Sequence, residues 1–128
     1  MNRVSLFVAA LAATLGCAAQ QHIEAVIGQI SSSRDANVTY VERRDDSHRL
    51  YRTTMVINIS DPQVYQRLVQ AFEADRTTTY YATRGNNFFR YCFNNGDGKS
   101  DYTLTSDEHS GSYSLVKQWR ATSDEDDD

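Results

Sequence analysis

The apolar run at the start of the chain constrains the fold most, because it decides how much sequence is left to form a domain. Arg3 is followed by an uncharged stretch from Val4 to Leu15, and then by small residues that end at Ala19. This order is typical of a cleaved secretory signal. The run has about a dozen residues, whereas a membrane-spanning helix needs about 20. The sequence therefore predicts a signal peptide over 1–19 and export, either to the periplasm or out of the cell.

Cys17 leaves a second interpretation of the same segment open. Gly16 and Cys17 resemble the end of a bacterial lipobox, where the cysteine is acylated and becomes the first residue of the mature protein. The segment departs from that motif in having Leu15 directly before the glycine and Thr14 where leucine normally stands. These departures favour simple cleavage near Ala19. Lipidation at Cys17 would instead give a membrane-anchored lipoprotein.

The remaining 109 residues are the right length for one domain with a single core. We expect this domain to cover residues 20–121. Residues 124–128 are all Asp or Glu, so we expect 122–128 to form a disordered acidic tail. The formal net charge of the whole chain is -4, and much of it lies in that tail. The folded body is therefore nearly neutral and shows no basic stripe along the sequence, which argues against a nucleic-acid partner.

Hydrophobic periodicity predicts two helices. Ile23, Val26, Ile27 and Ile30 follow a helical repeat, which predicts a helix over 21–32. A second helix is expected to begin at Asp61 and Pro62, since Asp is a good N-cap and Pro suits the first helical position, and to end near residue 75. Its apolar residues show the same repeat: Tyr65, Leu68, Val69 and Phe72.

The rest of the domain reads as strands. Alternating residues predict a hairpin of strands 37–43 and 49–59, and four further strands over 77–83, 87–93, 101–105 and 112–120. The segment Asn94–Gly98 contains both Asn-Gly and Asp-Gly, the strongest short hairpin signal. The predicted order is α-β-β-α-β-β-β-β. Short turns favour a mostly antiparallel sheet with both helices on one face, which is an α+β two-layer sandwich.

Aromatic residues suggest an interaction surface. Neighbours on a strand point to opposite faces, so Tyr80 and Tyr81 cannot both enter a one-sided core. The same holds for Phe88 and its neighbour Phe89. Tyrosine and tryptophan are favoured at interfaces because they offer rigid, amphipathic area. The residues that we expect on this surface are Tyr80, Tyr81, Phe88, Tyr91 and Trp119.

The histidines and the mature cysteine provide no convincing catalytic or metal site. His22, His48 and His109 have no second histidine or cysteine at ligand spacing, so neither a metal nor another cofactor is expected. Cys92 lies among apolar residues, which indicates a structural thiol. His109 with Asp107 or Glu108 is the one acid–histidine cluster, and a small hydrolase built on it is an alternative hypothesis.

The segment Asn95–Asp101 looks at first like a calcium loop. An EF-hand would need oxygen ligands where Phe93 and Leu104 stand, so a plain hairpin turn is favoured. An exported α+β domain with such a hairpin suggests a second alternative, a peptidase inhibitor that acts through the loop Asn94–Lys99.

The overall layout resembles small secreted proteins of unknown function from gut Bacteroidetes. The resemblance covers the export signal, the first helix, the strand Leu50–Ile59 and the helix Val64–Asp75. It implies an exported α+β protein and supplies no catalytic residue. The leading hypothesis is a non-enzymatic binding module outside the cytoplasm, with a protein or glycan partner on its aromatic strand face. A membrane partner is expected only if Cys17 is lipidated.

Overall fold

A computed structural model describes residues 20–33, 36–107 and 109–122 of the chain. The predicted signal peptide, with Cys17, and the acidic residues 124–128 lie outside the described residues. Thr122, where the predicted tail begins, is described: its backbone N–H donates to the carbonyl of Asp97 over 3.3 Å.

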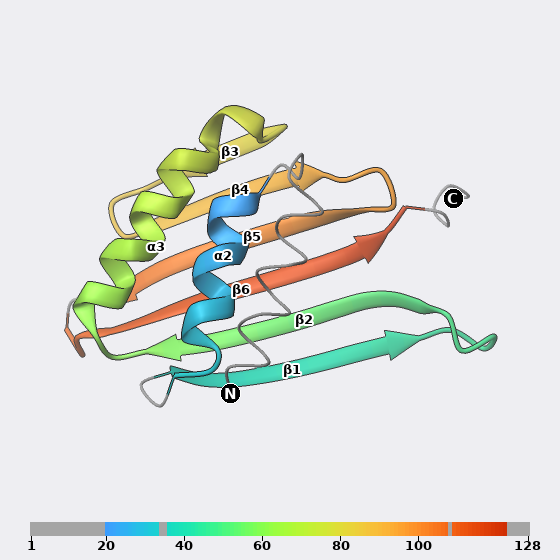
Figure 1. The fold of residues 1–128 in the computed structure, drawn as a ribbon, viewed down its shortest axis with the longest axis horizontal. Helices are drawn as coiled ribbons and strands as arrows, with labels where there is room; N and C mark the ends of the chain where they lie inside the picture. Colours follow the sequence, from blue (N-terminus) through green and yellow to red (C-terminus); the bar gives the residue numbers. More distant parts are fainter. Residues whose placement is uncertain (1–19, 34–35, 108, 123–128) are drawn as a thin grey trace.

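Two helices lie side by side on one face of a six-stranded sheet (Figure 1). The helices are α2 (Gln21–Ile30) and α3 (Pro62–Asp75), and α3 continues into the short 3-10 turn η1 (Arg76–Thr78). The strands are β1 (Ala36–Arg44), β2 (Leu50–Ile59), β3 (Tyr81–Arg84), β4 (Phe88–Asn94), β5 (Gly98–Asp107) and β6 (Ser112–Ala121). All neighbouring strands pair antiparallel. The predicted α+β two-layer fold is confirmed.

The strand order is β1-β2-β6-β5-β4-β3. β3 to β6 form a meander, and its last strand, β6, pairs with β2 rather than ending at a free edge. α3 carries the chain from β2 across to the far edge, where β3 begins (Figure 1). The pairing of β6 with β2 makes the first hairpin and the meander one continuous sheet.

Two predicted strands differ from those observed. Residues 77–83 were expected to be extended, but η1 takes the first of them because the hydroxyls of Thr78 and Thr79 donate back to the carbonyls of Asp75 and Arg76 over 2.9 and 2.8 Å. Such local bonds compete with strand formation. β5 is longer than the predicted 101–105 because it pairs along its length with β4 and β6, which holds even its polar first residues extended.

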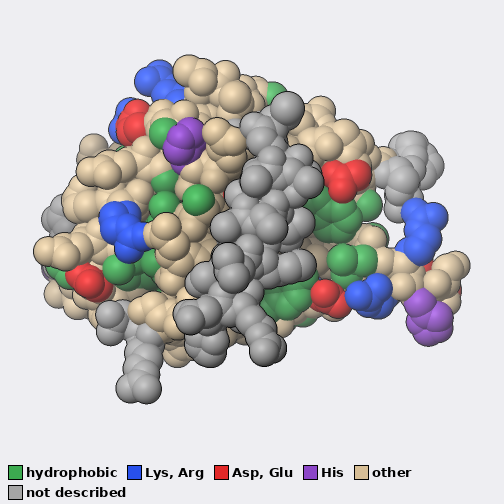
Figure 2. All heavy atoms as spheres, in the orientation of Figure 1, with side chains coloured by type: hydrophobic (Ala, Val, Ile, Leu, Met, Phe, Trp, Pro, Cys, Tyr) green, Lys and Arg blue, Asp and Glu red, His purple; other side chains and the backbone are tan. Residues whose placement is uncertain are grey.

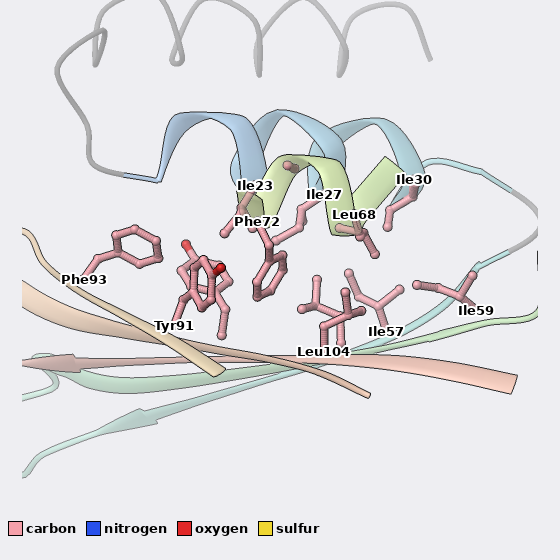
Figure 3. Packing of buried hydrophobic residues seen from close by; sticks show 13 residues of the cluster. Ile23, Ile27, Ile30, Ile57, Ile59, Leu68, Phe72, Tyr91, Phe93 and Leu104 are labelled. Carbon is pink, nitrogen blue, oxygen red and sulfur yellow. The ribbon is translucent and has the colours of Figure 1, made fainter. Parts of the chain in front are cut away.

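The core lies between the helices and the sheet (Figure 3). Ile57, Leu115 and Leu104 stand directly opposite one another on β2, β6 and β5, and none of them is exposed. Directly opposed residues share a face, so this register defines the side that carries the helices. Phe72 of α3 reaches down to the sheet, with its ring centroid 5.1 Å from that of Tyr91 and 6.5 Å from that of Tyr102.

The two helices begin on different kinds of cap. The N-cap of α3 is Asp61, as predicted, and its carboxylate accepts the N–H of Gln63 over 2.9 Å. The first residues of α2 are capped from another element by Asp75, the last residue of α3. The Asp75 carboxylate accepts the N–H of Ile23 over 2.8 Å and that of His22 over 3.2 Å, and the His22 ring nitrogen Nδ1 lies 2.7 Å away.

Replacing Asp75 by alanine is expected to lower the free energy of unfolding by about 2–3 kcal/mol. Asp75 is 3% exposed, and its loss leaves two backbone N–H groups of α2 without their acceptor. Asp61→Ala is the matched control, because it removes one exposed cap and should cost about 1 kcal/mol. Urea denaturation of both variants makes the comparison; equal losses would contradict the capping of α2 by Asp75.

Candidate functional site

The second face of the sheet carries neither of the two described helices (Figure 1), and we call it the open face. Strand register places on it the residues that alternate with the core. One line across the sheet joins Thr54, Gln118, Asp101, Cys92 and Tyr81, each directly opposite the next. Side chains on this face are therefore available for contacts outside the core.

Four cations form an adjacent line on the open face. Arg43 stands opposite Arg52, Arg52 opposite Arg120, and Arg120 opposite Lys99. We call this line across β1, β2, β6 and β5 the basic row. All four residues are exposed, and none of their side chains makes an ion pair with another described residue.

A hollow of about 280 Å³ lies at this end of the open face. Its lining comes from β2, β4, β5 and β6 and from Tyr80, which directly precedes β3. Three members of the basic row, Arg52, Lys99 and Arg120, contribute to it. The fourth cation in the lining is Arg90.

Tyr80 and Tyr81 each contact a cation of the lining. Tyr80 is 52% exposed, and Lys99 Nζ lies 5.6 Å from its ring centroid. Tyr81 is 49% exposed, and Arg90 Cζ lies 5.8 Å from its ring centroid. Such cation–π contacts hold the rings beside the positive charges, so a ligand meets aromatic surface and cations together.

One cation of the hollow is already neutralised. Arg90 Nη2 donates to Asp101 Oδ2 over 2.7 Å, and Arg90 Nε donates to both Asp101 oxygens over 3.2 Å. This hydrogen-bonded pair raises the pKa of Arg90 above its ordinary value. Asp101 is also the one carboxylate in the lining, so Arg52, Lys99 and Arg120 keep an uncompensated charge.

Cys92 lines the same hollow from β4 but is not suited to nucleophilic attack. Its side chain is buried, and this burial raises the pKa of the thiol, with the neighbouring Asp101 charge acting in the same direction. The thiol is therefore protonated at neutral pH, and the reactive form is the thiolate. This agrees with the structural role that the sequence suggests.

The structure corrects one residue of the predicted aromatic surface and places a second on the helix-bearing side. Tyr91 is 1% exposed and packs against Phe72, because it falls on the helix-bearing side of β4. Trp119 is opposite Thr53 and Ser100, on that same side, and its ring covers the backbone of Gly98: a Cβ added there would lie 2.3 Å from Trp119 Nε1. Tyr91 cannot meet a partner. Trp119 is among the residues that line the hollow.

Phe88 and Phe89 point to opposite faces of the sheet, as strand alternation requires. Phe89 packs toward Phe72 with ring centroids 6.0 Å apart, whereas Phe88 is half-buried and lies on the open face opposite Thr105. Phe88 does not line the hollow. Of the five predicted surface residues, Tyr80 and Tyr81 are therefore the pair that the structure brings beside the cations.

The hydrolase alternative receives no support from the turn after β5. Asp107 accepts the backbone N–H of His109 over 3.0 Å, so its carboxylate is used to shape the turn. Glu108 lies outside the described residues. Nor do His, Cys, Asp and Glu side chains gather into a group of three that would hold a metal ion, over the residues that are described.

The loop proposed for an inhibitor is a tight turn. The N–H of Asn95 donates to the carbonyl of Gly98 over 2.9 Å, and the Asn95 side chain donates to Ser100 over 3.2 Å. Thr122 holds the turn from outside, through its hydroxyl on Gly96 and its N–H on Asp97. The turn is thus tied to the sheet, and its main contribution to the surface is Lys99 at the basic row.

Charge is distributed differently on the helix-bearing face. Figure 2 shows cationic and acidic side chains of that face scattered singly among polar ones. There, Lys117 Nζ donates to Glu24 over 2.5 Å, and the hydroxyl of Tyr102 donates to the same carboxylate. Lys117 and Glu24 are thus paired on this side, whereas no described carboxylate pairs with a member of the basic row.

Sequence reasoning missed the basic row because its members come from two strand pairs, β1–β2 and β5–β6, that are distant from each other in the chain. No short motif joins Arg43, Arg52, Lys99 and Arg120, and each looks like an ordinary surface residue. Only the pairing of β2 with β6 brings them into line. Alternation along the strand 49–59 separates Arg52 from the apolar residues, but the strand order could not be read from the sequence.

Comparison with known proteins supplies no family for this arrangement. No protein-family model matches the sequence, and a search of curated proteins finds no match. Among the described helices, none has the length and apolar character needed to cross a bilayer.

Proposed function

We propose that the protein is an exported, non-enzymatic binding module that captures an acidic polypeptide segment on its open face. The observation that carries this proposal is the hollow in which Tyr80 lies beside Lys99, Arg120 and Arg52. The proposal keeps the aromatic surface expected from the sequence and adds the cations that the sheet places next to it. Export rests on the apolar N-terminal run described above.

The chemistry of the surface favours an acidic partner. Arg52 and Arg120 offer guanidinium groups, which pair with carboxylates through two parallel hydrogen bonds. Tyrosine and arginine are also the side chains that are most enriched among the residues that dominate binding at protein interfaces. Tyr80 and Tyr81 would receive the apolar parts of the partner, while the cations hold its carboxylates.

The spacing of the cations suits an extended peptide. Neighbouring strands are about 4.8 Å apart, so the basic row presents one charge at about this interval. An extended chain advances about 3.4 Å per residue and its side chains point alternately to opposite sides, so acids at every second position, about 7 Å apart, can face the row along its length. An acidic segment that crosses the strands thus matches the row better than a single small anion does.

Removing two cations is expected to weaken binding of a pentaglutamate peptide at least tenfold. The double variant Arg52→Ala, Arg120→Ala loses two charged hydrogen-bonding groups, and about 1.4 kcal/mol corresponds to each factor of ten. Arg67→Ala on α3 is the control, since it removes one cation from the other side of the molecule. Isothermal titration of the peptide at low ionic strength measures the affinities.

The tyrosines are tested with a matched pair. Tyr81→Ala should weaken the peptide about threefold to tenfold and leave the fold intact, whereas Tyr40→Ala should leave the affinity unchanged. Tyr40 is 50% exposed, also on an edge strand, and its register with Met55 places it on the helix-bearing side. Equal effects of the two tyrosines, or tighter binding of an acidic oligogalacturonate than of the peptide, would contradict the proposed partner.

A further inference from the structure

We infer that the acidic segment 124–128 of the same chain binds to the basic row. The inference deepens the proposed function, because it names what covers the binding face when no partner is present. An external acidic segment would then bind by displacing this internal one.

The four cations of the basic row repel one another unless anions lie beside them. Arg43, Arg52, Arg120 and Lys99 stand directly opposite one another, and like charges in such cross-strand positions repel. No described carboxylate pairs with any of them, and the one carboxylate in the lining of the hollow, Asp101, is paired with Arg90. A group of anions on this line would remove the repulsion.

The chain delivers such a group to the right place. β6 ends at Ala121, one residue after Arg120. Thr122 is then fixed against the turn between β4 and β5 by its bonds to Asp97 and Gly96, close to the start of β5 where Lys99 stands. The first acid, Asp124, follows two residues later. The acidic segment therefore leaves the domain beside the row.

Its length also matches. Four neighbouring strands span about 14 Å from the first to the last. Five residues in extended form, Asp124 to Asp128, span a similar distance of about 14 Å. Alternate acids of the extended segment, Asp124, Asp126 and Asp128, can thus face the row between Lys99 and Arg43. Because it is attached to the domain, its effective concentration there is of the order of millimolar.

The first experiment observes the internal contact without any partner. In the full chain, all five acids are neutralised by Asp124→Asn, Glu125→Gln, Asp126→Asn, Asp127→Asn and Asp128→Asn. Heteronuclear NMR at low ionic strength should show shifts in backbone amides and Arg side chains of the basic row, and little change at Arg67 or elsewhere on α3. In about 0.5 M salt, where charges more than a few ångströms apart are screened, these differences should shrink.

A double-mutant cycle that combines the neutralised segment with substitutions in the basic row provides the control. In the background Arg52→Ala, Arg120→Ala, the same neutralisation should no longer shift the remaining row amides, because the two changes act on one interaction. Independent shifts in both backgrounds would overturn the inference. So would shifts that grow with protein concentration, since they would show that the acidic segment binds another copy of the chain.

The second experiment separates this inference from the proposed function. Pentaglutamate should bind the neutralised variant at least tenfold more tightly than it binds the unaltered chain, because the internal competitor is gone. A peptide of sequence Asp-Glu-Asp-Asp-Asp added to the neutralised variant should restore the original shifts, and Asn-Gln-Asn-Asn-Asn should not. If pentaglutamate binds both proteins equally, the internal occupant is wrong and the proposed function stands. If pentaglutamate binds neither protein while the double-mutant cycle shows coupling, the proposed function is wrong and the inferred contact of segment 124–128 with the basic row stands.

Discussion

Phe72→Ala is expected to lower the free energy of unfolding by about 3–5 kcal/mol. Phe72 is fully buried between α3 and the sheet, where it lies above Tyr91 (Figure 3). Its ring contacts Phe89, Tyr91 and Tyr102 on β4 and β5. Truncation leaves a cavity among these rings, and rigid aromatic neighbours collapse poorly into it. A loss of this size is a large part of the total stability of a small domain.

Phe88→Ala is the matched control for Phe72. It removes the same side chain from a half-buried position on the open face, and should cost about 1 kcal/mol. Urea denaturation followed by far-ultraviolet circular dichroism measures both variants, with Phe89→Ala as a third that belongs to the core side. Equal losses for Phe88 and Phe72 would contradict the assignment of the two faces.

Stability is expected to fall at alkaline pH because of Tyr102. Burial raises the pKa of this phenol well above its ordinary value, and the neighbouring Glu24 charge and hydrogen bond act in the same direction. Below pH 10 the hydroxyl is protonated in both states, so its full contribution is present. Above pH 10 the unfolded chain loses the proton while the folded chain keeps it. The free energy of unfolding should then fall by about 1.4 kcal/mol per pH unit from this group.

Tyr102→Phe tests that slope. The variant cannot ionise at this position. Between pH 10 and 11.5 its free energy of unfolding should therefore fall less steeply than that of the unaltered protein, by about 1.4 kcal/mol per pH unit. Burial also raises the pKa of Tyr91, so part of the slope should remain. Measuring both proteins first at pH 7 removes the constant cost of losing the bond to Glu24. Identical slopes at alkaline pH would show that Tyr102 does not carry the effect.

Much of the fold was predictable because its signals are local. The repeat of Ile23, Ile27 and Ile30 and the cap at Asp61 define two helices, and the alternation in β2 defines a strand. What was not predictable depends on contacts between distant segments. Three features depend on residues that carry no mutual signal in the sequence. They are the pairing of β6 with β2, the full length of β5, and the capping of α2 by Asp75.

The candidate site was predicted only in part for the same reason. Alternation correctly implies that Tyr80 and Tyr81 cannot both enter a one-sided core, but it cannot say which face each strand residue takes. Tyr91 was therefore assigned to the surface although it lies in the core. The cations were overlooked because a nearly neutral composition hides a local excess. That excess arises only when antiparallel register puts Arg52, Arg120 and Lys99 on one line.

The most direct measurement of the central claim is an NMR titration of the isotopically labelled full chain with pentaglutamate at low ionic strength. Binding on the open face predicts progressive shifts at Arg52, Lys99, Arg120 and Tyr81, and none at Arg67 or Tyr40. The same residues should lose their response in the Arg52→Ala, Arg120→Ala variant. Shifts centred on the helix-bearing face, or no shifts even after the acidic segment 124–128 is neutralised, would contradict the claim.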